Sequence, residues 1–285
     1  MILLVGATGK VGSKVAAELA ARGTRARALV RDPEAARAQL NGTVELVRGD
    51  LADVESIQAA LDGAEVAYLA NGQTDQQVEL ETNFVAAAEA AGLPRLVKVT
   101  APHATADGPH VFGRWQSQIE ARIGASGIPT TLLRPSMYAA NLLGSAAGIK
   151  DGKLYSTAGD AKLTWVDPAD VAAVAVAALA DPAHAGHTYE LTGPEAVDYD
   201  ELAERFSRVL GRPIEHVRID DETFRLALTE AGLPAWTVDA FVEMYARGVR
   251  SGGFERTSDD VERILGRSPR SIDQWIEANR AAFEA

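Results

Sequence analysis

A doubly wound α/β fold, in which helices cover both faces of a parallel sheet, is the architecture that this 285-residue sequence predicts. Three observations lead to it. Short β-branched runs alternate with alanine-rich amphipathic stretches through the first half of the chain, glycine or an Asp-Pro pair marks the limits of several stretches, and a glycine-rich loop follows the first apolar run. Hydrophobic residues make up 47% of the chain, which is enough for one large core and a smaller satellite.

The expected elements follow that rhythm. Gly23 and Gly92 stand where the C-terminus of a helix needs a left-handed residue. Asp32-Pro33 and Asp167-Pro168 each place a side-chain acceptor at an N-cap and proline in the first helical turn. The strands are expected at 2–5, 25–30, 44–48, 65–70, 95–100 and 130–134, and the helices between them at 11–22, 33–39, 54–61, 76–91 and 111–125.

The pattern changes after Arg134, which indicates that a second lobe is inserted there. An irregular segment is expected around 151–160, and a helix at 168–179 with a strand at 188–191 then leads back to the sheet. Polar amphipathic helices are expected from Asp200 to the end. The sequence therefore predicts two interleaved domains, one formed by 1–134 with 165–192 and a smaller one formed by 135–164 and 193–285.

Charge and residue usage argue against several classes of function. The formal net charge of −12 and the absence of a basic stripe disfavour nucleic acid as a partner. The sequence has no cysteine, so disulfides, cysteine-bound zinc and thiolate catalysis are excluded, and His184 with His187 lacks the carboxylates of a metal site. The apolar runs at 2–5 and 171–180 are too short for a signal peptide or a membrane span. We expect a cytoplasmic protein without a membrane partner, and a homodimer is one alternative for its oligomeric state.

Gly6, Gly9 and Gly12 recur at three-residue intervals between the first apolar run and the first amphipathic stretch. In a strand–loop–helix unit this spacing allows a tight turn, close approach of the backbone to a pyrophosphate and close packing of helix on strand. The loop lacks the final Gly-Lys-Ser/Thr of a nucleoside-triphosphate loop, so Lys10 is expected to be a solvated side chain within it. The larger domain is therefore predicted to be a Rossmann-type dinucleotide-binding domain.

The end of the second expected strand carries Arg31 and Asp32, which are the two residue types that distinguish NADPH from NADH. Asp32 is already explained as an N-cap, whereas Arg31 has no structural duty in the sequence pattern, so NADPH is favoured and NADH is the alternative. Asp50, at the end of the third strand, is expected near the adenine amino group, with a loop cap as the alternative.

Taken together, the motifs resemble the NmrA-like branch of the atypical short-chain dehydrogenase/reductases, close to bacterial NADPH-dependent quinone reductases. The stretches that carry the resemblance lie at 6–12, 29–33, 49–51, 89–92, 126–135, 138–141, 167–172 and 189–194. The resemblance implies a six- or seven-stranded parallel sheet and a smaller C-terminal lobe that binds the substrate. It also implies that Gly6, Thr8, Gly9, Val11 and Gly12 meet the pyrophosphate, Arg31 the 2′-phosphate and Asp50 with Leu51 the adenine, while Ala70, Asn71, Gly72, Thr100 and Ala101 line the path to the nicotinamide.

The sequence departs from the common reductase pattern at the proton donor. None of the six tyrosines is followed by lysine four residues later, and the fifth helix has Gln116 before Glu120 where members of this branch often have histidine before glutamate. That helix therefore supplies no obvious acid. A quinone needs less help, because its hydroquinone anion is far less basic than an alkoxide and can take a proton from water, so transfer depends on positioning.

The candidates for positioning the acceptor are Tyr138, Asn141 and Gln116, with Thr100 standing where related enzymes have serine. A packed aromatic for Tyr138 and a helix cap or solvated residue for Asn141 are the structural alternatives. His103 and His110 flank a segment that could form a lid, with solvated loop histidines as the alternative. Two apolar stripes are expected to be lobe core, although the second could wall a pocket: Phe224, Leu226 and Leu228, and Trp236, Phe241 and Tyr245.

The sequence thus predicts an NADPH-dependent oxidoreductase that passes hydride to a small apolar electrophile, a quinone first and an enone or imine second. The alternative is a redox-sensing regulatory protein that binds NADP(H) without turnover.

Overall fold

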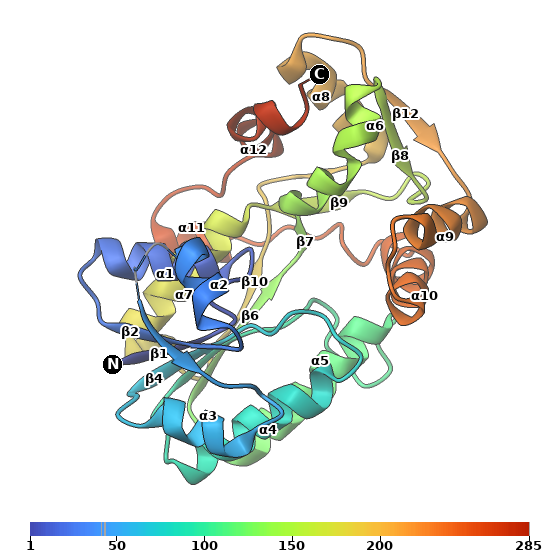
Figure 1. The fold of residues 1–285 in the computed structure, drawn as a ribbon. Helices are drawn as coiled ribbons and strands as arrows, with labels where there is room; N and C mark the ends of the chain where they lie inside the picture. The colour runs from blue at the N-terminus through green and yellow to red at the C-terminus, as the bar shows by residue number, and fades with distance from the viewer. Residues whose placement is uncertain (41, 43, 285) are drawn as a thin grey trace. The chain divides into compact units, whose positions relative to one another are not determined.

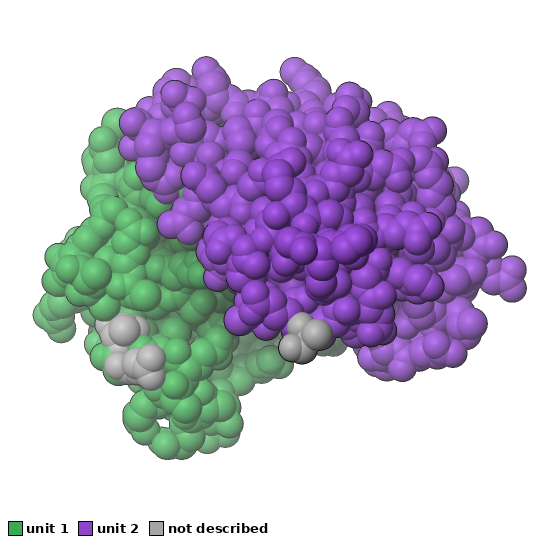
Figure 2. All heavy atoms as spheres, turned by 90° about the horizontal axis from the view of Figure 1, so that it is seen from above, with its two compact units in different colours: residues 1–106, 115–134, 168–190 green, residues 107–114, 135–167, 191–285 purple. Residues whose placement is uncertain are grey.

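A computed structural model describes residues 1–40, 42 and 44–284 of the chain. The chain divides into two compact units, the first formed by Met1–Ala106, Trp115–Arg134 and Pro168–Glu190, and the second by Asp107–Arg114, Pro135–Asp167 and Leu191–Ala285, of which the structure describes residues up to 284 (Figure 2). The expected division after Arg134 lies at a unit boundary. Two expected limits differ from those of the structure: residues 107–114 belong to the second unit, and the returning segment is 168–190 instead of 165–192.

The first unit is built on a seven-stranded parallel sheet in the order β10-β6-β5-β4-β1-β2-β3 (Figure 1). Its strands are β1 (Ile2–Val5), β2 (Ala26–Val30), β3 (Glu45–Arg48), β4 (Val66–Leu69), β5 (Leu96–Val99), β6 (Thr130–Pro135) and β10 (Thr188–Leu191). Every residue of β1, β4 and β5 is buried. Apart from Lys98 on β5 these strands are apolar, as a parallel sheet needs when helices cover both of its faces.

The helices of the first unit lie on both faces of this sheet, with α1, α2 and α7 on one side and α3 and α4 on the other (Figure 1). A core cluster between the sheet and the α3–α4 layer includes Leu3 and Leu69 from the strands and Phe84 and Ile119 from the helices. The helices are α1 (Gly12–Ala21), α2 (Pro33–Leu40), α3 (Val54–Leu61), α4 (Gln77–Ala90), α5 (Val111–Ser126), α7 (Pro168–Ala180) and the short 3-10 helix η2 (Pro182–His184).

The local signals at Gly23, Gly92 and Asp32 are confirmed, and the N-cap role of Asp167 stays a prediction. Gly23 and Gly92, which follow α1 and α4, have positive φ values of 66° and 67°. Asp32 caps α2 because its carboxylate accepts hydrogen bonds from the backbone N–H groups of Glu34 and Ala35, at 3.0 and 3.2 Å. The expected strands and helices of this unit agree with the structure to within one or two residues at each end.

The second unit contains two small sheets and a set of helices. One sheet has the strand order β11-β9-β7 and the other pairs β12 with β8. Its elements are β7 (Met137–Tyr138), η1 (Ala139–Ser145), α6 (Ala146–Lys150), β8 (Lys153–Ser156), β9 (Leu163–Val166), β11 (Ala196–Val197), α8 (Tyr199–Leu210), β12 (Glu215–Arg218), α9 (Asp221–Glu230), α10 (Ala235–Glu243), η3 (Met244–Val249), α11 (Asp260–Leu265), α12 (Ile272–Ala278) and η4 (Arg280–Ala282).

Two expectations for this unit are wrong. The segment around 151–160 is not irregular throughout, since it contains β8, and the region after Asp200 is not purely helical, since it contains β12. These two strands pair in parallel, with Lys153 opposite Glu215. Lys and Ser stand in β8, and Glu, His and Arg in β12, so neither segment shows the apolar run of a buried strand, and each becomes a strand only by pairing with a distant partner.

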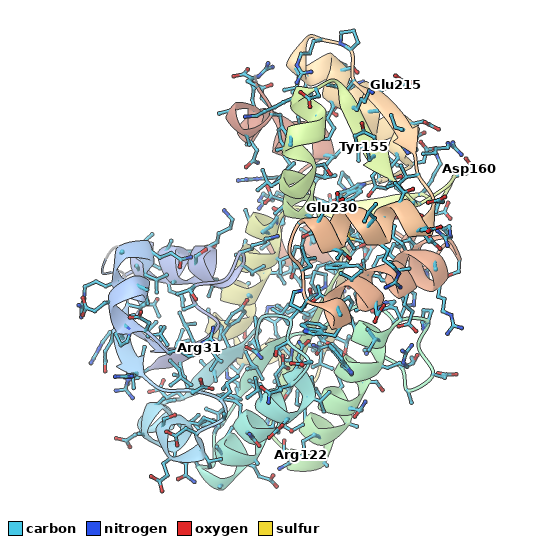
Figure 3. All side chains as sticks on the ribbon, turned by 45° about the vertical axis from the view of Figure 1, so that its right-hand side comes forward. Arg31, Arg122, Tyr155, Asp160, Glu215 and Glu230 are labelled. Atoms are coloured by element: carbon cyan, nitrogen blue, oxygen red, sulfur yellow. The ribbon has the colours of Figure 1, made fainter. Side chains whose placement is uncertain are left out.

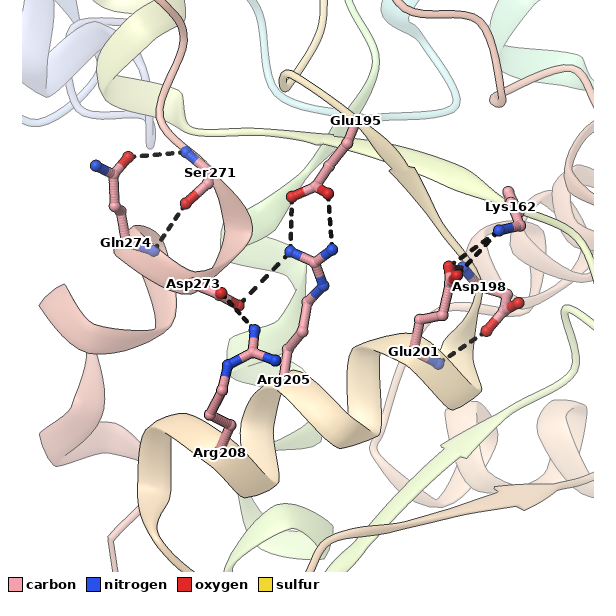
Figure 4. Close-up of polar contacts among 9 residues, drawn as sticks. All are labelled: Lys162, Glu195, Asp198, Glu201, Arg205, Arg208, Ser271, Asp273 and Gln274. Carbon is pink, nitrogen blue, oxygen red and sulfur yellow. Dashed lines mark hydrogen bonds and ion pairs between the residues drawn. The ribbon is translucent and has the colours of Figure 1, made fainter.

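Helix α8 is fixed at its start and on its exposed face (Figure 4). Asp198 and Glu201 form a capping box at its N-terminus, and Lys162 binds the Glu201 carboxylate at 3.0 Å. Farther along, Arg205 makes a bidentate pair with Glu195 at 2.6 and 2.7 Å. These contacts join α8 to the segments before β9 and β11, which ties the helical part of the unit to its three-stranded sheet.

Within the described part of the chain, no helix combines the length and the apolar character that a membrane crossing requires.

Candidate cofactor site

The turn between β1 and α1 requires glycine at two positions for reasons internal to the fold. Gly6 has a φ of 85°, and a Cβ atom there would lie 1.9 Å from the carbonyl oxygen of Ala70 at the end of β4. A Cβ atom on Gly12 would lie 2.0 Å from the Gly6 carbonyl oxygen. No side chain fits at either position, so β1, the loop and the start of α1 pack directly backbone to backbone.

Gly9 differs from these two glycines. The nearest atom to a Cβ on Gly9 would be the Gly6 carbonyl oxygen at 3.3 Å, which is tight but not excluded. Thr8, Gly9 and Lys10 are exposed, and Lys10 is therefore on the surface of the loop as expected. Because the fold itself does not demand glycine here, an open backbone at position 9 suits the close approach of a ligand.

The N-terminus of α1 is not closed by a side chain. Val11 at the N-cap provides no side-chain hydrogen bond, and the first turn holds no acidic residue. By contrast, α3, α8, α9 and α12 are each capped by a side chain, from Asp53, Asp198, Asp220 and Ser271 respectively. Unsatisfied N–H groups at a helix start attract an anion, so α1 fits a pyrophosphate better than those helices do.

The residues expected to select the cofactor are placed differently from each other. The Asp32 carboxylate is engaged as the N-cap of α2, whereas Arg31 is exposed and its side chain makes no ion pair with the described residues (Figure 3). Both follow β2, next to β1 in the sheet. A guanidinium that is not committed to the fold suits a phosphate, and a carboxylate that already caps a helix is less suited to a ribose diol.

Asp50 follows β3 and serves the local turn. One of its carboxylate oxygens accepts a hydrogen bond from the backbone of Ala52 at 2.9 Å, and its backbone exchanges hydrogen bonds with the Ser56 hydroxyl. The side chain of the neighbouring Leu51 is 7% exposed and belongs to the core cluster. These contacts support the loop-cap alternative for Asp50 and leave the adenine contact of both residues a prediction.

The end of β4 carries an unsatisfied polar atom. Ala70 donates its backbone N–H to the Val5 carbonyl at 3.1 Å, which keeps this strand end against β1. The next side chain, Asn71, has its Nδ2 atom buried with no hydrogen-bond partner among the described residues. A buried amide donor in that state fits a site that a bound group completes.

At the β5–α5 corner, formed by Thr100, Glu120 and Arg134, the side chains are fully engaged. The Thr100 hydroxyl donates to Glu120 at 2.7 Å, and Arg134, on β6, binds the other oxygen of the Glu120 carboxylate at 2.6 Å. Arg134 also reaches Glu190 on β10 at 3.4 Å. Burial opposes the charge on Arg134, but the hydrogen bonds and charges of Glu120 and Glu190 outweigh it and raise the pKa of the guanidinium.

This corner has a chemical consequence. A carboxylate paired with arginine can only accept hydrogen bonds, so the single hydroxyl proton of Thr100 is used by Glu120. Thr100 therefore presents lone pairs, and Glu120 offers no proton to a substrate. The sequence indicated that Glu120 is not an obvious acid but did not reveal its pairing with Arg134, whose only signal was a charged residue near the end of an otherwise uncharged strand.

Gln116 lies one helical turn before Glu120 on α5 and is 5% exposed. Its Oε1 atom is buried without a hydrogen-bond partner among the described residues. Asn71 and Gln116 thus leave one amide donor and one amide acceptor unsatisfied in the first unit. A carboxamide such as that of nicotinamide carries both complementary groups, so these residues fit the expected cofactor.

Tyr138 and Asn141 belong to the second unit and lie on the consecutive elements β7 and η1. Burial raises the pKa of Tyr138 above its ordinary value, so its hydroxyl stays protonated at neutral pH. Asn141 is exposed, and its Nδ2 donates to the Met137 sulfur at 3.4 Å. Tyr138 can therefore donate a hydrogen bond, and Asn141 is neither a helix N-cap nor buried.

Several other expectations for the second unit are corrected by the structure. His110 is not a solvated loop residue: it is 1% exposed, accepts a hydrogen bond from the Gly113 N–H at 3.1 Å and stacks on Phe254. Leu226, expected in the lobe core, is 57% exposed. Tyr245 packs against Phe224 and hydrogen-bonds Tyr199 at 2.9 Å, which agrees with the core alternative for its stripe.

Ser156, His216 and Asp200 form an arrangement that the sequence did not reveal. The Ser156 hydroxyl lies 3.0 Å from His216 Nε2, and His216 Nδ1 lies 2.7 Å from an oxygen of Asp200. This is the connectivity of a nucleophilic triad. However, Ser156 is 4% exposed on the inner face of β8, so a substrate has no access to its hydroxyl, and the three side chains instead join β8, β12 and α8.

Comparisons with known proteins identify the family of the chain. Residues 1–276 match the NmrA-like family. The chain is 35% identical to an NAD(P)H azoreductase from Xenophilus azovorans, over 100% of both chains, and 37% identical to a (4-alkanoyl-5-oxo-2,5-dihydrofuran-3-yl)methyl phosphate reductase from Streptomyces griseus, over 99% of both chains. Among solved structures, it superposes on an NADPH-dependent quinone oxidoreductase from Escherichia coli in complex with NADPH, with a TM-score of 0.89, 27% identity and coverage of 98% of this chain and 100% of that one. The chain therefore belongs to the NmrA-like family.

Proposed function

We propose that this chain transfers hydride from NADPH to a small apolar electrophile, with a quinone as the favoured acceptor. Two relatives that align along the full chain are named as reductases, one of them using NAD(P)H, and NAD(P)H-dependent oxidoreduction is the class of reaction that the chain performs. The identity of the acceptor is our inference. The observation that carries it is the β5–α5 corner, where no side chain is available to protonate an alkoxide.

The cofactor half of the proposal rests on the β1–α1 turn and on Arg31. The open N-terminus of α1 and the exposed backbone at Gly9 would hold the pyrophosphate, and Arg31 would hold the 2′-phosphate. Asn71 and Gln116 would meet the carboxamide with their unsatisfied amide atoms. Bound NADPH supplies the hydride.

The acceptor half rests on proton supply. The Thr100 hydroxyl donates its hydrogen bond to Glu120, and the Glu120 side chain is paired with Arg134. Reduction of a quinone needs two electrons and two protons in total, delivered as one hydride and one proton, and the hydroquinone anion takes that proton from water. The role of this chain is then to orient the acceptor, and Tyr138 with Asn141 are the residues that we assign to that role.

The experiment that tests the proposal is anaerobic oxidation of NADPH by the purified protein with a panel of benzoquinones, naphthoquinones, enones and aldehydes. We expect saturable turnover with quinones, weaker turnover with enones and the slowest turnover with simple aldehydes, because Thr100 and Glu120 supply no proton to an alkoxide. Fast aldehyde reduction would contradict the assignment of the acceptor. Tight binding of NADPH without consumption across the whole panel would contradict the enzyme and favour a redox-sensing role.

A further inference from the structure

The core of the first unit contains an ion pair that the cofactor site described above does not use. Lys98 lies in the middle of the sheet on β5, and its ammonium is 3.0 Å from a carboxylate oxygen of Glu81 on α4. Their side chains are 1% and 0% exposed. Two apolar residues of similar size are often at least as stabilising as a buried pair, because desolvating two charges costs about as much as their attraction returns. The pair therefore calls for a role other than stability.

The contacts of this pair reach the backbone at the end of β5. The Lys98 ammonium also donates a hydrogen bond to the carbonyl of Val99. The ladder between β4 and β5 ends with Leu69 opposite Lys98, so Val99 lies beyond the last paired residue on that side. Lys98 thus provides a hydrogen-bond donor for the Val99 carbonyl, next to the point where the pairing of β5 with β4 ends.

The same pair reaches the first turn of α4. The Gln77 side chain donates to the second oxygen of Glu81 at 3.1 Å and is itself 5% exposed. Gln76, at the N-cap of this helix, makes no side-chain cap. Three buried polar side chains therefore form a row, which consists of Gln77, Glu81 and Lys98. This row holds the start of α4 from the protein interior, and the helix has no side-chain cap on its surface.

The row adjoins in sequence the segments that are expected to meet the nicotinamide, since Lys98 precedes Thr100 by two residues and Gln77 follows Gly72 by five. β4 continues into Ala70–Gly72, which precedes α4, and β5 continues into Thr100 and Ala101. In open parallel sheets, ligands bind at the carboxyl ends of the strands. A shift in the start of α4 or in the end of β5 would displace these two segments relative to each other.

We propose that Gln77, Glu81 and Lys98 are positioning residues that fix the nicotinamide half of the cofactor site. This inference rests on the proposed use of NADPH. It separates the site into two halves: the adenine half depends on the β1–α1 turn and Arg31, and the nicotinamide half depends on the buried row.

The test replaces the row with apolar residues of similar length in the variant Gln77→Met/Glu81→Met/Lys98→Met. Affinities for NADPH and for adenosine 2′,5′-bisphosphate, which lacks the nicotinamide half, are measured by calorimetry on wild type and variant. We expect NADPH to bind about tenfold more weakly to the variant, with its Tm within about 5 °C of wild type and adenosine 2′,5′-bisphosphate affinity unchanged. An unchanged NADPH affinity in the folded variant, or equal losses for both ligands, would overturn the proposal.

A matched control removes an exposed ion pair between α4 and α5, in Arg122→Gln/Glu89→Gln. The guanidinium of Arg122 (Figure 3) is 2.6 Å from the Glu89 carboxylate, and both side chains are at least 30% exposed. The affinities of the control variant for NADPH and for adenosine 2′,5′-bisphosphate should equal those of wild type. If the triple variant does not fold, the variant Gln77→Leu tests the proposal instead. It keeps the Lys98–Glu81 ion pair and removes only the hydrogen bond from Gln77 to Glu81. We expect this variant to weaken NADPH about threefold, and no change would overturn the inference. Failure of the wild-type protein to bind NADPH would instead refute the proposed function.

Discussion

Two corners of the same sheet hold their polar groups in opposite ways. At the β1–α1 corner, glycine backbone packs on glycine backbone, the helix start is uncapped and Arg31 is exposed without an ion pair among the described residues. At the β5–α5 corner, the polar side chains of Thr100, Glu120 and Arg134 satisfy one another. The first corner keeps donors and charge available for a ligand, and the second uses them within the fold.

The difference indicates how binding and chemistry are divided. Backbone N–H groups and an uncommitted guanidinium bind phosphate strongly but transfer no proton. A paired carboxylate and the hydroxyl bound to it stabilise the fold but donate no proton either. Under the proposed function, the first corner holds the dinucleotide, and the second corner gives no proton to the acceptor.

The largest effect on NADPH affinity should come from Gly12→Ala, which disrupts the β1–α1 corner. The new Cβ would lie 2.0 Å from the Gly6 carbonyl oxygen, so α1 must shift, and we expect NADPH affinity to fall by at least about a hundredfold. Gly9→Ala, whose Cβ would have its nearest contact at 3.3 Å, should fold normally and lose about tenfold. Fluorescence titration of NADPH on both variants measures this, and equal losses would show that Gly9 is as structural as Gly12.

Arg31→Ala tests the charge at the same corner. Because its side chain has no partner in the described structure, its removal should leave Tm unchanged, weaken NADPH about thirtyfold and weaken NADH less than threefold. Arg37→Ala on the neighbouring helix, where the arginine pairs with Glu34 on the surface, is the control and should affect neither cofactor. Equal losses of NADPH and NADH in Arg31→Ala would remove the argument for the 2′-phosphate.

Arg134→Met should show the reverse pattern at the paired corner. It leaves the Glu120 carboxylate, 12% exposed, without its cation, which should lower the free energy of unfolding by about 1–3 kcal/mol. Affinity for adenosine 2′,5′-bisphosphate should stay within about twofold, since the binding corner is untouched. Urea denaturation measures the free energy of unfolding, and calorimetry measures the affinity. A large loss of affinity at unchanged stability would show that the β5–α5 corner binds the ligand and does not stabilise the fold.

The smallest effect on stability is expected at the exposed Arg250–Asp221 pair of the second unit. This pair shows how much an ion pair outside the core contributes. The Arg250 guanidinium, hydrogen-bonded to Asp221, lowers the pKa of that carboxyl from 3.8 to about 2. Because the folded pKa lies below the unfolded value, the stabilisation is present above pH 3.8 and is lost as the pH falls toward about 2.

More than a third of the Asp221 side chain is exposed, so the contribution is screened and should be below about 1 kcal/mol. Asp221→Asn should therefore cost little at neutral pH and reduce the loss of stability on acidification, as followed by thermal melts between pH 5 and pH 2. An acid profile identical to that of wild type would show that the pair contributes nothing.

The first unit could be predicted closely because its signals are local. Strands β1 and β10 and helix α3 begin and end where the sequence places them, since each is an apolar or amphipathic run between glycine, proline or a capping aspartate. In the second unit β8 and β12 were missed, because Lys-Leu-Tyr-Ser and Glu-His-Val-Arg are mixed polar segments that become strands only by pairing with each other across a long stretch of sequence. His110 and Leu226 were misplaced for the same reason, as burial depends on which distant elements arrive nearby.

The sequence by itself determined the glycine loop, the N-cap role of Asp32, the family and the absence of a Tyr–Lys pair, because each depends on residues at short fixed spacing. Only the tertiary structure decided that Glu120 is bound by Arg134, that Asn71 and Gln116 keep unsatisfied amide atoms, and that Gln77, Glu81 and Lys98 form a buried row. These groups come from different strands and helices. Their partners, and hence their protonation and hydrogen-bonding capacity, are set by the packing of elements that spacing along the chain does not encode.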